Sequence, residues 1–65
     1  MRLQVNGMPQ DVQASDLARL LVELEYEDAV VATALNQTFV RAKDRAATSL
    51  KEGDEVEILT PRQGG

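Results

Sequence analysis

Hydrophobic and polar residues alternate along two short segments of the chain, one near each end. Leu3 and Val5 alternate with polar neighbours at the start, and Val56 and Ile58 alternate with glutamates within residues 55–60. Because successive side chains of a strand point to opposite faces of a sheet, this period of two predicts a half-buried strand at each place. The alternation near the C-terminus is the clearest strand signal in the chain.

Two pairs of turn residues predict hairpins. Asn6-Gly7 directly follows the first strand, and this dipeptide readily adopts the positive φ angles of a tight turn. We expect the returning strand over residues 10–14. The apolar run 29–35 favours another strand, which turns at Asn36-Gln37 into a short strand at 38–40.

One segment has the period of an amphipathic helix. Its leucines recur at i, i+3, i+4 and i+7 and form one apolar face: Leu17, Leu20, Leu21 and Leu24. Ser15 offers an N-cap, and Asp16 places a negative charge in the first turn. The helix should end near residues 25–27. Residues 41–50 are polar apart from one anchoring leucine, and they suit a connection that contains one helical turn.

The expected order is strand, strand, helix, strand, strand, connection, strand. One helix with a leucine face beside four to five strands predicts an α+β fold, in which a mixed sheet packs on one main helix. With the hairpins outside, the first and last strands pair centrally and in parallel. This is the β-grasp, or ubiquitin-like, arrangement. We expect a single domain over residues 1–65, with a flexible C-terminal tail at 61–65.

The composition argues against an enzyme site. The chain has 65 residues with no cysteine and no histidine, so it lacks a thiolate nucleophile, the usual general base and the commonest metal ligand. A domain of this length leaves no room for an enclosed substrate cavity with a supporting shell. We therefore expect no catalytic side chain, no bound cofactor and no metal.

Charge and hydropathy limit the kinds of partner. The formal net charge is −4, whereas binding to a nucleic-acid backbone needs a basic surface. No apolar run reaches the roughly 18 residues of a membrane-spanning helix, and the first residues lack the apolar stretch of a signal peptide. We expect a cytoplasmic protein that is monomeric when free and binds neither nucleic acid nor a membrane.

Several short motifs, in their order along the whole chain, resemble those of a known family. They are Val5-Asn6-Gly7, the leucine face of 17–24, Val31-Ala32-Thr33-Ala34-Leu35-Asn36, Leu50-x-x-Gly53-Asp54-x-Val56-Glu57-Ile58-Leu59 and Gly64-Gly65. The chain resembles the ThiS-type sulfur carriers of thiamine biosynthesis, and more broadly the ubiquitin-like sulfur carriers that include the small subunit of molybdopterin synthase. Carriers of this type often have Val-Pro-Arg and then an aromatic after the second hairpin. This chain has Val40-Arg41-Ala42 and then Arg45 there.

The resemblance implies that the terminal carboxylate of Gly65 is the reactive group. An α-carboxylate is ionised at neutral pH and resists nucleophilic attack. The family's chemistry implies that an E1-like enzyme adenylates it with ATP and Mg²⁺, and that sulfur from a persulfide-bearing donor then replaces AMP. The resulting thiocarboxylate is the sulfur source of a thiazole synthase. Gly64 and Gly65 suit these steps because glycine has no Cβ and fits a narrow channel.

Five further residues are candidates for partner contacts. Pro61 ends the last strand and stiffens the exit from the domain, and Arg62 and Gln63 supply reach and polar contacts. With a two-residue second turn, Phe39 lies on the outer face of the sheet, and the alternation of the last strand puts Leu59 there too. Two exposed apolar side chains on the side from which the tail emerges indicate a partner surface.

Alternative functions agree with the same residues. The same chemistry can serve molybdopterin or another sulfur acceptor, although members of that branch tend to be longer and the compact chain favours the thiamine type. A different class is a ubiquitin-like modifier, in which Gly65 is joined to a lysine amine. A plain interaction module, whose sheet face merely binds, is a further alternative.

Overall fold

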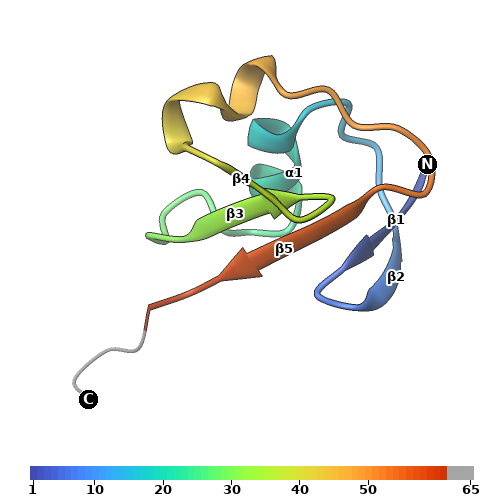
Figure 1. Ribbon diagram of the computed structural model, residues 1–65, viewed down its shortest axis with the longest axis horizontal. Coiled ribbons are helices and arrows are strands. Elements are labelled where there is room, and N and C mark those ends of the chain that lie inside the picture. The colour runs from blue at the N-terminus through green and yellow to red at the C-terminus, as the bar shows by residue number, and fades with distance from the viewer. Residues whose placement is uncertain (62–65) are drawn as a thin grey trace.

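The computed structural model describes residues 1–61, which form a five-stranded mixed sheet, an α-helix and a 3-10 helix (Figure 1). The elements, in chain order, are β1 (Arg2–Val5), β2 (Met8–Asp11), α1 (Leu17–Glu23), β3 (Ala32–Leu35), β4 (Thr38–Val40), η1 (Ala42–Ala47) and β5 (Glu55–Leu59). The strand order in the sheet is β2-β1-β5-β3-β4. The predicted α+β class, with a mixed sheet on one main helix, is confirmed.

The first and last strands of the sheet lie side by side at its centre. β1 and β5 run parallel, with Gln4 opposite Glu55 and Val5 opposite Val56. The two hairpins lie outside this pair, β1–β2 on one side and β3–β4 on the other, and both are antiparallel. The predicted central parallel pair is therefore confirmed.

The register of the second half of the sheet is also the predicted one. Thr33 lies opposite Val40 and Ile58, so these three side chains share the face that packs on α1. Phe39 is paired with Ala34 on the other face of the sheet. A slip of one residue would exchange the two faces, and the two-residue turn at 36–37 prevents it.

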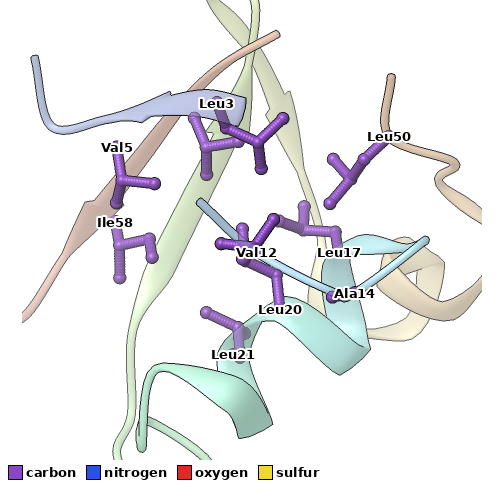
Figure 2. Packing of buried hydrophobic residues seen from close by; sticks show 10 residues of the cluster. Leu3, Val5, Val12, Ala14, Leu17, Leu20, Leu21, Leu50 and Ile58 are labelled. Atoms are coloured by element: carbon purple, nitrogen blue, oxygen red, sulfur yellow. The ribbon is translucent and has the colours of Figure 1, made fainter. Parts of the chain in front are cut away.

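The hydrophobic core lies between the sheet and α1. Figure 2 shows leucines of α1 facing side chains of β1 and β5. The buried apolar residues in the described part of the chain are Leu3, Val5, Val12, Ala14, Leu17, Leu20, Leu21, Leu50, Val56 and Ile58. Complete burial of a side chain of this size contributes about 1.5–3 kcal/mol. The leucine spacing of the sequence therefore marks the face that joins α1 to the sheet.

Both ends of α1 differ from the prediction. The N-cap is Asp16 and not Ser15, because an Asp16 carboxylate oxygen accepts the backbone N–H of Arg19 at 2.8 Å. The helix ends at Glu23, earlier than predicted. There the N–H of Glu25 bonds to Val22 and that of Tyr26 to Leu21, at 3.0 and 2.7 Å, which is the Schellman pattern.

Two predicted strands have different bounds. The turn at Asn6-Gly7 sets Val5 opposite Met8, so β2 begins at Met8 and is complete by Asp11, earlier than the predicted range 10–14. β3 begins at Ala32 and not at residue 29, because the chain makes one more turn in which Ala29 N–H bonds to Tyr26 at 2.9 Å.

Candidate functional site

The predicted reactive residues and their neighbours divide between two parts of the chain. Gly64 and Gly65, together with Arg62 and Gln63, lie outside the described residues. Pro61 is described and exposed. Figure 1 shows that β5, which leads to these residues, ends on the side of the molecule away from the N-terminus. The site is therefore built from the end of β5 and the surfaces beside it.

The end of β5 is defined by its neighbours on both sides. On one side Leu59 lies opposite Ala32, which is the first residue of β3. On the other side the parallel pairing with β1 stops at Val5 and Val56. Pro61 follows two residues after β5 and has no N–H with which to continue a ladder. The sheet thus releases the chain at Leu59.

Apolar side chains gather on the outer face of the sheet beside this exit. Phe39 of β4 and Leu59 of β5 are each 65% exposed. Between them, on the same face of β3, lie Ala32 and Ala34, which are paired with Leu59 and Phe39 respectively. We call Phe39, Ala34, Ala32 and Leu59 the outer apolar patch. The predicted exposure of Phe39 and Leu59 is confirmed.

Val30 is a further exposed apolar residue, just before β3. It is 79% exposed and stands two residues before β3. The sequence interpretation included Val30 in a strand and did not identify it as a surface residue. Its alternation with Ala32 was the signal that could have indicated its exposure.

Acidic side chains border the outer apolar patch. A hollow of about 190 Å³ opens beside β5 and is lined by Gln4, Gly7, Gln37, Glu55, Val56 and Glu57. Glu57 is paired with Ala34 and lies on the same face as the patch. A partner that covers this face would therefore contact apolar side chains and at least one carboxylate.

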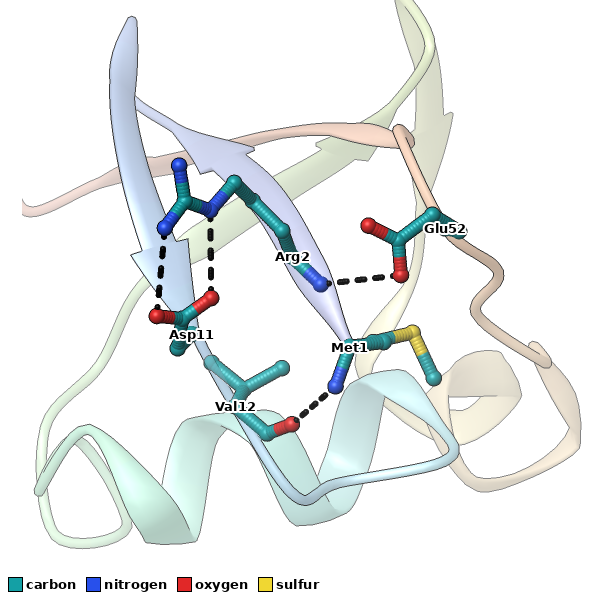
Figure 3. Close-up of polar contacts among 5 residues, drawn as sticks. All are labelled: Met1, Arg2, Asp11, Val12 and Glu52. Atoms are coloured by element: carbon teal, nitrogen blue, oxygen red, sulfur yellow. Dashed lines mark hydrogen bonds and ion pairs between the residues drawn. The ribbon is translucent and has the colours of Figure 1, made fainter.

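The opposite half of the outer face carries an ion pair. Arg2 donates to both carboxylate oxygens of Asp11, from Nε at 3.1 Å and from Nη2 at 3.3 Å (Figure 3). This hydrogen-bonded pair raises the pKa of Arg2 and lowers the pKa of Asp11. Two further hydrogen bonds lie beside this ion pair. The backbone N–H of Arg2 donates to the carboxylate of Glu52, and the terminal amine of Met1 donates to the carbonyl of Val12. The outer face is thus ionic over β1–β2 and apolar over β3–β5.

Two side chains make contacts that the sequence interpretation did not predict. Asn6 exchanges two hydrogen bonds with the backbone of Ile58 in β5. Arg45 donates from Nη2 to the carbonyl of Val31 at 2.7 Å and from Nε to Oγ1 of Thr33 at 3.0 Å. The only sequence signal was indirect, namely that Arg45 stands where related carriers often have an aromatic. Both contacts join residues that are distant along the chain.

Residues 1–61 contain no group of three or more His, Cys, Asp or Glu side chains that could hold a metal ion. Among the helices of this described part, none is both long and apolar enough to span a bilayer.

Comparison with known proteins relates the chain to one family. The model of the ThiS family matches residues 3–65. The crystal structure of the thiamine biosynthesis protein ThiS from Geobacter metallireducens superposes with a TM-score of 0.84 and 35% identity, and all of both chains is covered. The solution structure of a thiamine biosynthesis protein from the same organism gives 0.80 and 33%, over all of this chain and 88% of that one.

A curated relative comes from another pathway. The molybdopterin synthase sulfur carrier subunit of Chlamydomonas reinhardtii is 44% identical over 52 residues, which cover 75% of this chain and 60% of that protein. The chain thus spans about 60% of the length of this relative.

Proposed function

The chain belongs to the ThiS family of ubiquitin-like sulfur carriers, and from this premise we propose that it carries sulfur as a thiocarboxylate on Gly65. The observation that supports the proposal most is the family match over residues 3–65, because it includes Gly64-Gly65. Glycine at both positions lets the backbone approach a nucleotide closely and adopt different conformations in different enzymes. The proposal requires Gly65 to be the C-terminal residue.

The proposed chemistry has two stages, both supplied by partner enzymes. An oxygen of the Gly65 carboxylate attacks the α-phosphorus of ATP, pyrophosphate leaves with Mg²⁺, and an acyl adenylate forms. The terminal sulfur of a protein persulfide then attacks the acyl carbon and displaces AMP. The resulting acyl disulfide is cleaved by a thiol, which releases the thiocarboxylate and forms a disulfide.

In this proposal the chain is a protein cosubstrate and not an enzyme. It contributes the reacting carboxyl group and a folded body, whereas an E1-like enzyme contributes ATP and the catalytic side chains. The further partners are a persulfide-bearing sulfur donor and the enzyme that consumes the thiocarboxylate. The proposed setting is the cytoplasm, where ATP is available.

We propose the outer apolar patch as the surface that the activating enzyme holds. Its support is the exposure of Phe39 and Leu59 and the position of Leu59 on the strand that leads to the tail. Aromatic and large apolar side chains at the centre of an interface commonly contribute most of its affinity. Pro61, Arg62 and Gln63 would then enter the enzyme with the tail.

We propose a thiazole synthase of thiamine biosynthesis as the sulfur acceptor. Two solved structures that cover this chain completely come from thiamine biosynthesis proteins. The second candidate is molybdopterin synthase, favoured by the 44% identity to a sulfur carrier subunit of that enzyme.

Intact-mass measurement tests the proposed function. The chain is incubated with ATP, Mg²⁺, a persulfide donor, a thiol and the E1-like enzyme of its own organism. The proposal expects a mass increase equal to the difference between sulfur and oxygen, and none when ATP is omitted. Conjugation to another protein would instead indicate a modifier, and an unchanged mass would contradict the proposal.

The acceptor is tested with the thiocarboxylated chain. It is offered separately to a thiazole synthase and to the large subunit of molybdopterin synthase, and the loss of sulfur is followed by mass. Sulfur loss with the thiazole synthase alone supports the thiamine pathway. Loss only with the large subunit of molybdopterin synthase would overturn that choice while leaving the carrier function intact.

A further inference from the structure

The side chain of Asn6 joins the first hairpin to the end of β5. Asn6 and Gly7 occupy the two central positions of the β1–β2 turn, with φ angles of 52° and 81°. The amide oxygen of Asn6 accepts the N–H of Ile58 at 2.8 Å, and its Nδ2 donates to the carbonyl of Ile58 at 3.1 Å. Asn6 is therefore bonded to both backbone polar groups of Ile58.

These two bonds extend the pairing of β1 with β5 beyond the end of β1. The backbone N–H of Gln4 donates to Asp54 and that of Asn6 to Val56, each at 2.9 Å. With a period of two, Ile58 is the next residue whose backbone groups point toward β1. The chain has already turned away at Gly7, so a side chain takes the place of the missing strand residue.

Asn6 thereby sets the last point at which β5 is held on both sides. Leu59 is paired with Ala32 on the β3 side, and Ile58 is bonded to Asn6 on the β1 side. Without the Asn6 side chain, bonding on the β1 side would stop at Val56. The following residues of β5 would then be held by β3 alone.

We infer that Asn6 is a positioning residue for activation of the C-terminal carboxyl group, because its side chain fixes where β5 leaves the sheet. This inference rests on the proposed function. A fixed exit keeps Leu59 in the outer apolar patch and starts the tail from a constant place relative to that patch. When an enzyme binds the patch, the tail then samples fewer orientations, so less entropy is lost when the carboxylate is placed beside ATP. Loss of the Asn6 side chain should therefore lower kcat for adenylation more than it raises KM.

The second hairpin offers a matched control. Asn36 occupies the corresponding turn position with φ 49°, and its side chain also makes two hydrogen bonds. It accepts the N–H of Glu55 at 2.9 Å and donates to the carboxylate of Asp54 at 3.1 Å. These bonds hold the start of β5, at the end away from the tail.

Glycine is the informative substitution at both turns. It adopts a positive φ without strain, so Asn6→Gly and Asn36→Gly keep the turns and delete two side-chain hydrogen bonds each. Asn6→Asp is an intermediate case, because a carboxylate can accept the N–H of Ile58 but cannot donate to its carbonyl. Comparing the three variants distinguishes the effect of losing hydrogen bonds at the end of β5, beside the tail, from the general effect of losing side-chain hydrogen bonds on stability.

The experiment measures pyrophosphate release with the activating enzyme, at a temperature where circular dichroism shows every variant to be folded. We expect Asn6→Gly to lower kcat roughly tenfold with KM changed by less than about twofold, since misplacement of a reacting group acts on kcat. Asn36→Gly should retain the wild-type kcat, and Asn6→Asp should lie between. In the free protein, amide hydrogen exchange of Ile58 should accelerate in Asn6→Gly and not in Asn36→Gly.

The outcomes distinguish the inference from the function on which it rests. A wild-type chain that is not adenylated contradicts the proposed function and removes the inference with it. A wild-type chain that is adenylated, with an equal kcat in Asn6→Gly or equal losses in both glycine variants, overturns the inference alone. Unchanged exchange of Ile58 in Asn6→Gly also overturns it, because the side chain then does not hold β5.

Discussion

Asp54 is a buried carboxylate, only 4% exposed, at the start of β5. It accepts hydrogen bonds from the Asn36 amide at 3.1 Å and from the backbone and ammonium groups of Lys51 at 2.9 and 3.2 Å. Burial alone would raise the pKa of Asp54, but these hydrogen bonds and the charge of Lys51 outweigh burial. The pKa therefore lies below its ordinary value of 3.8. The ionised form of Asp54 stabilises the turn from which β5 begins.

This pKa shift predicts a pH-dependent contribution to stability. Because the folded-state pKa lies below the unfolded-state value, the contribution is complete above the unfolded value and is lost as the pH falls through the folded value. We expect Asp54→Ala to lower the free energy of unfolding by about 2 kcal/mol at neutral pH. Urea unfolding at a series of pH values should show this difference shrinking below the ordinary pKa. A difference that stays constant down to acidic pH would contradict the prediction.

Glu25 occupies a position that normally favours glycine. It follows the C-cap of α1 with a φ of 68°, in the left-handed region that costs a residue with a Cβ about 1–2 kcal/mol. We expect Glu25→Gly to raise the free energy of unfolding by about 1 kcal/mol, the gain from relieved strain being partly offset by entropy. Thermal and urea unfolding measure this change in the free energy of unfolding. Glu27→Gly is the control, and an equal gain there would refute the explanation by backbone strain.

At the scale of an element, η1 is held by a charged residue in place of apolar contacts. It has no buried residue and no side-chain cap at its N-terminus. Arg45 connects it to Thr33 of β3 and to Val31, the residue before β3. The buried hydroxyl of Thr33 in turn donates to the carbonyl of Val40 at 2.8 Å. The guanidinium thus attaches η1 to the sheet.

The Arg45 contact predicts an asymmetry between two basic residues. Arg45→Lys keeps the charge, but an ammonium group cannot donate both hydrogen bonds in the fixed planar geometry of a guanidinium. We expect it to lower the free energy of unfolding by about 1–2 kcal/mol. Lys43→Ala, an exposed site in the same helix, should change it by less than about 0.5 kcal/mol. Equal free energies of unfolding for the two variants in urea would refute the proposal that Arg45 holds η1 against the sheet.

Local sequence signals predicted the elements better than their ends. Alternation around Val56 and the two-residue turn at Asn36-Gln37 determine strands and register through neighbouring residues, and these predictions are confirmed. The wrong N-cap has a distant cause. The carbonyl of Ser15 accepts the N–H of Leu50 at 3.0 Å, and Asp16 forms an isolated bridge with Ser49. Such pairings with a remote segment determine where α1 begins.

The same difference applies to the candidate site. The exposure of Phe39 and Leu59 could be predicted because strand alternation and hairpin register are local. The contacts of Asn6 and Arg45 could not, because their partners lie far along the chain and depend on the completed sheet. The roles of Gly64 and Gly65 stay predictions, since these residues lie outside the described part of the chain.

At the scale of the whole molecule, the outer apolar patch predicts a surface effect that leaves the fold intact. Leu59→Glu should raise KM for adenylation about tenfold, because a carboxylate replaces an apolar contact at the proposed interface. The free energy of unfolding should hardly change, since Leu59 is largely exposed. Steady-state kinetics and urea unfolding measure the two effects.

Met8→Glu provides the matched control for the patch. Met8 is 64% exposed, similar to Leu59, but belongs to β2 at the far edge of the sheet. We expect its KM to equal that of the wild type. Equal increases in both variants would point to the added negative charge, and unchanged activation by Leu59→Glu would contradict the proposed contact surface.

The parallel pairing of β1 with β5 also determines how the domain responds to mechanical force. β1 begins beside the N-terminus, β5 leads toward the C-terminal residues, and the two strands run in the same direction. Tension between the two ends of the chain therefore loads the hydrogen bonds between these strands in shear. They must break together and not one after another, as they would in an antiparallel hairpin pulled open from its ends. A pull applied to both ends of the chain thus acts on a pair of strands that separates only when several hydrogen bonds break at once.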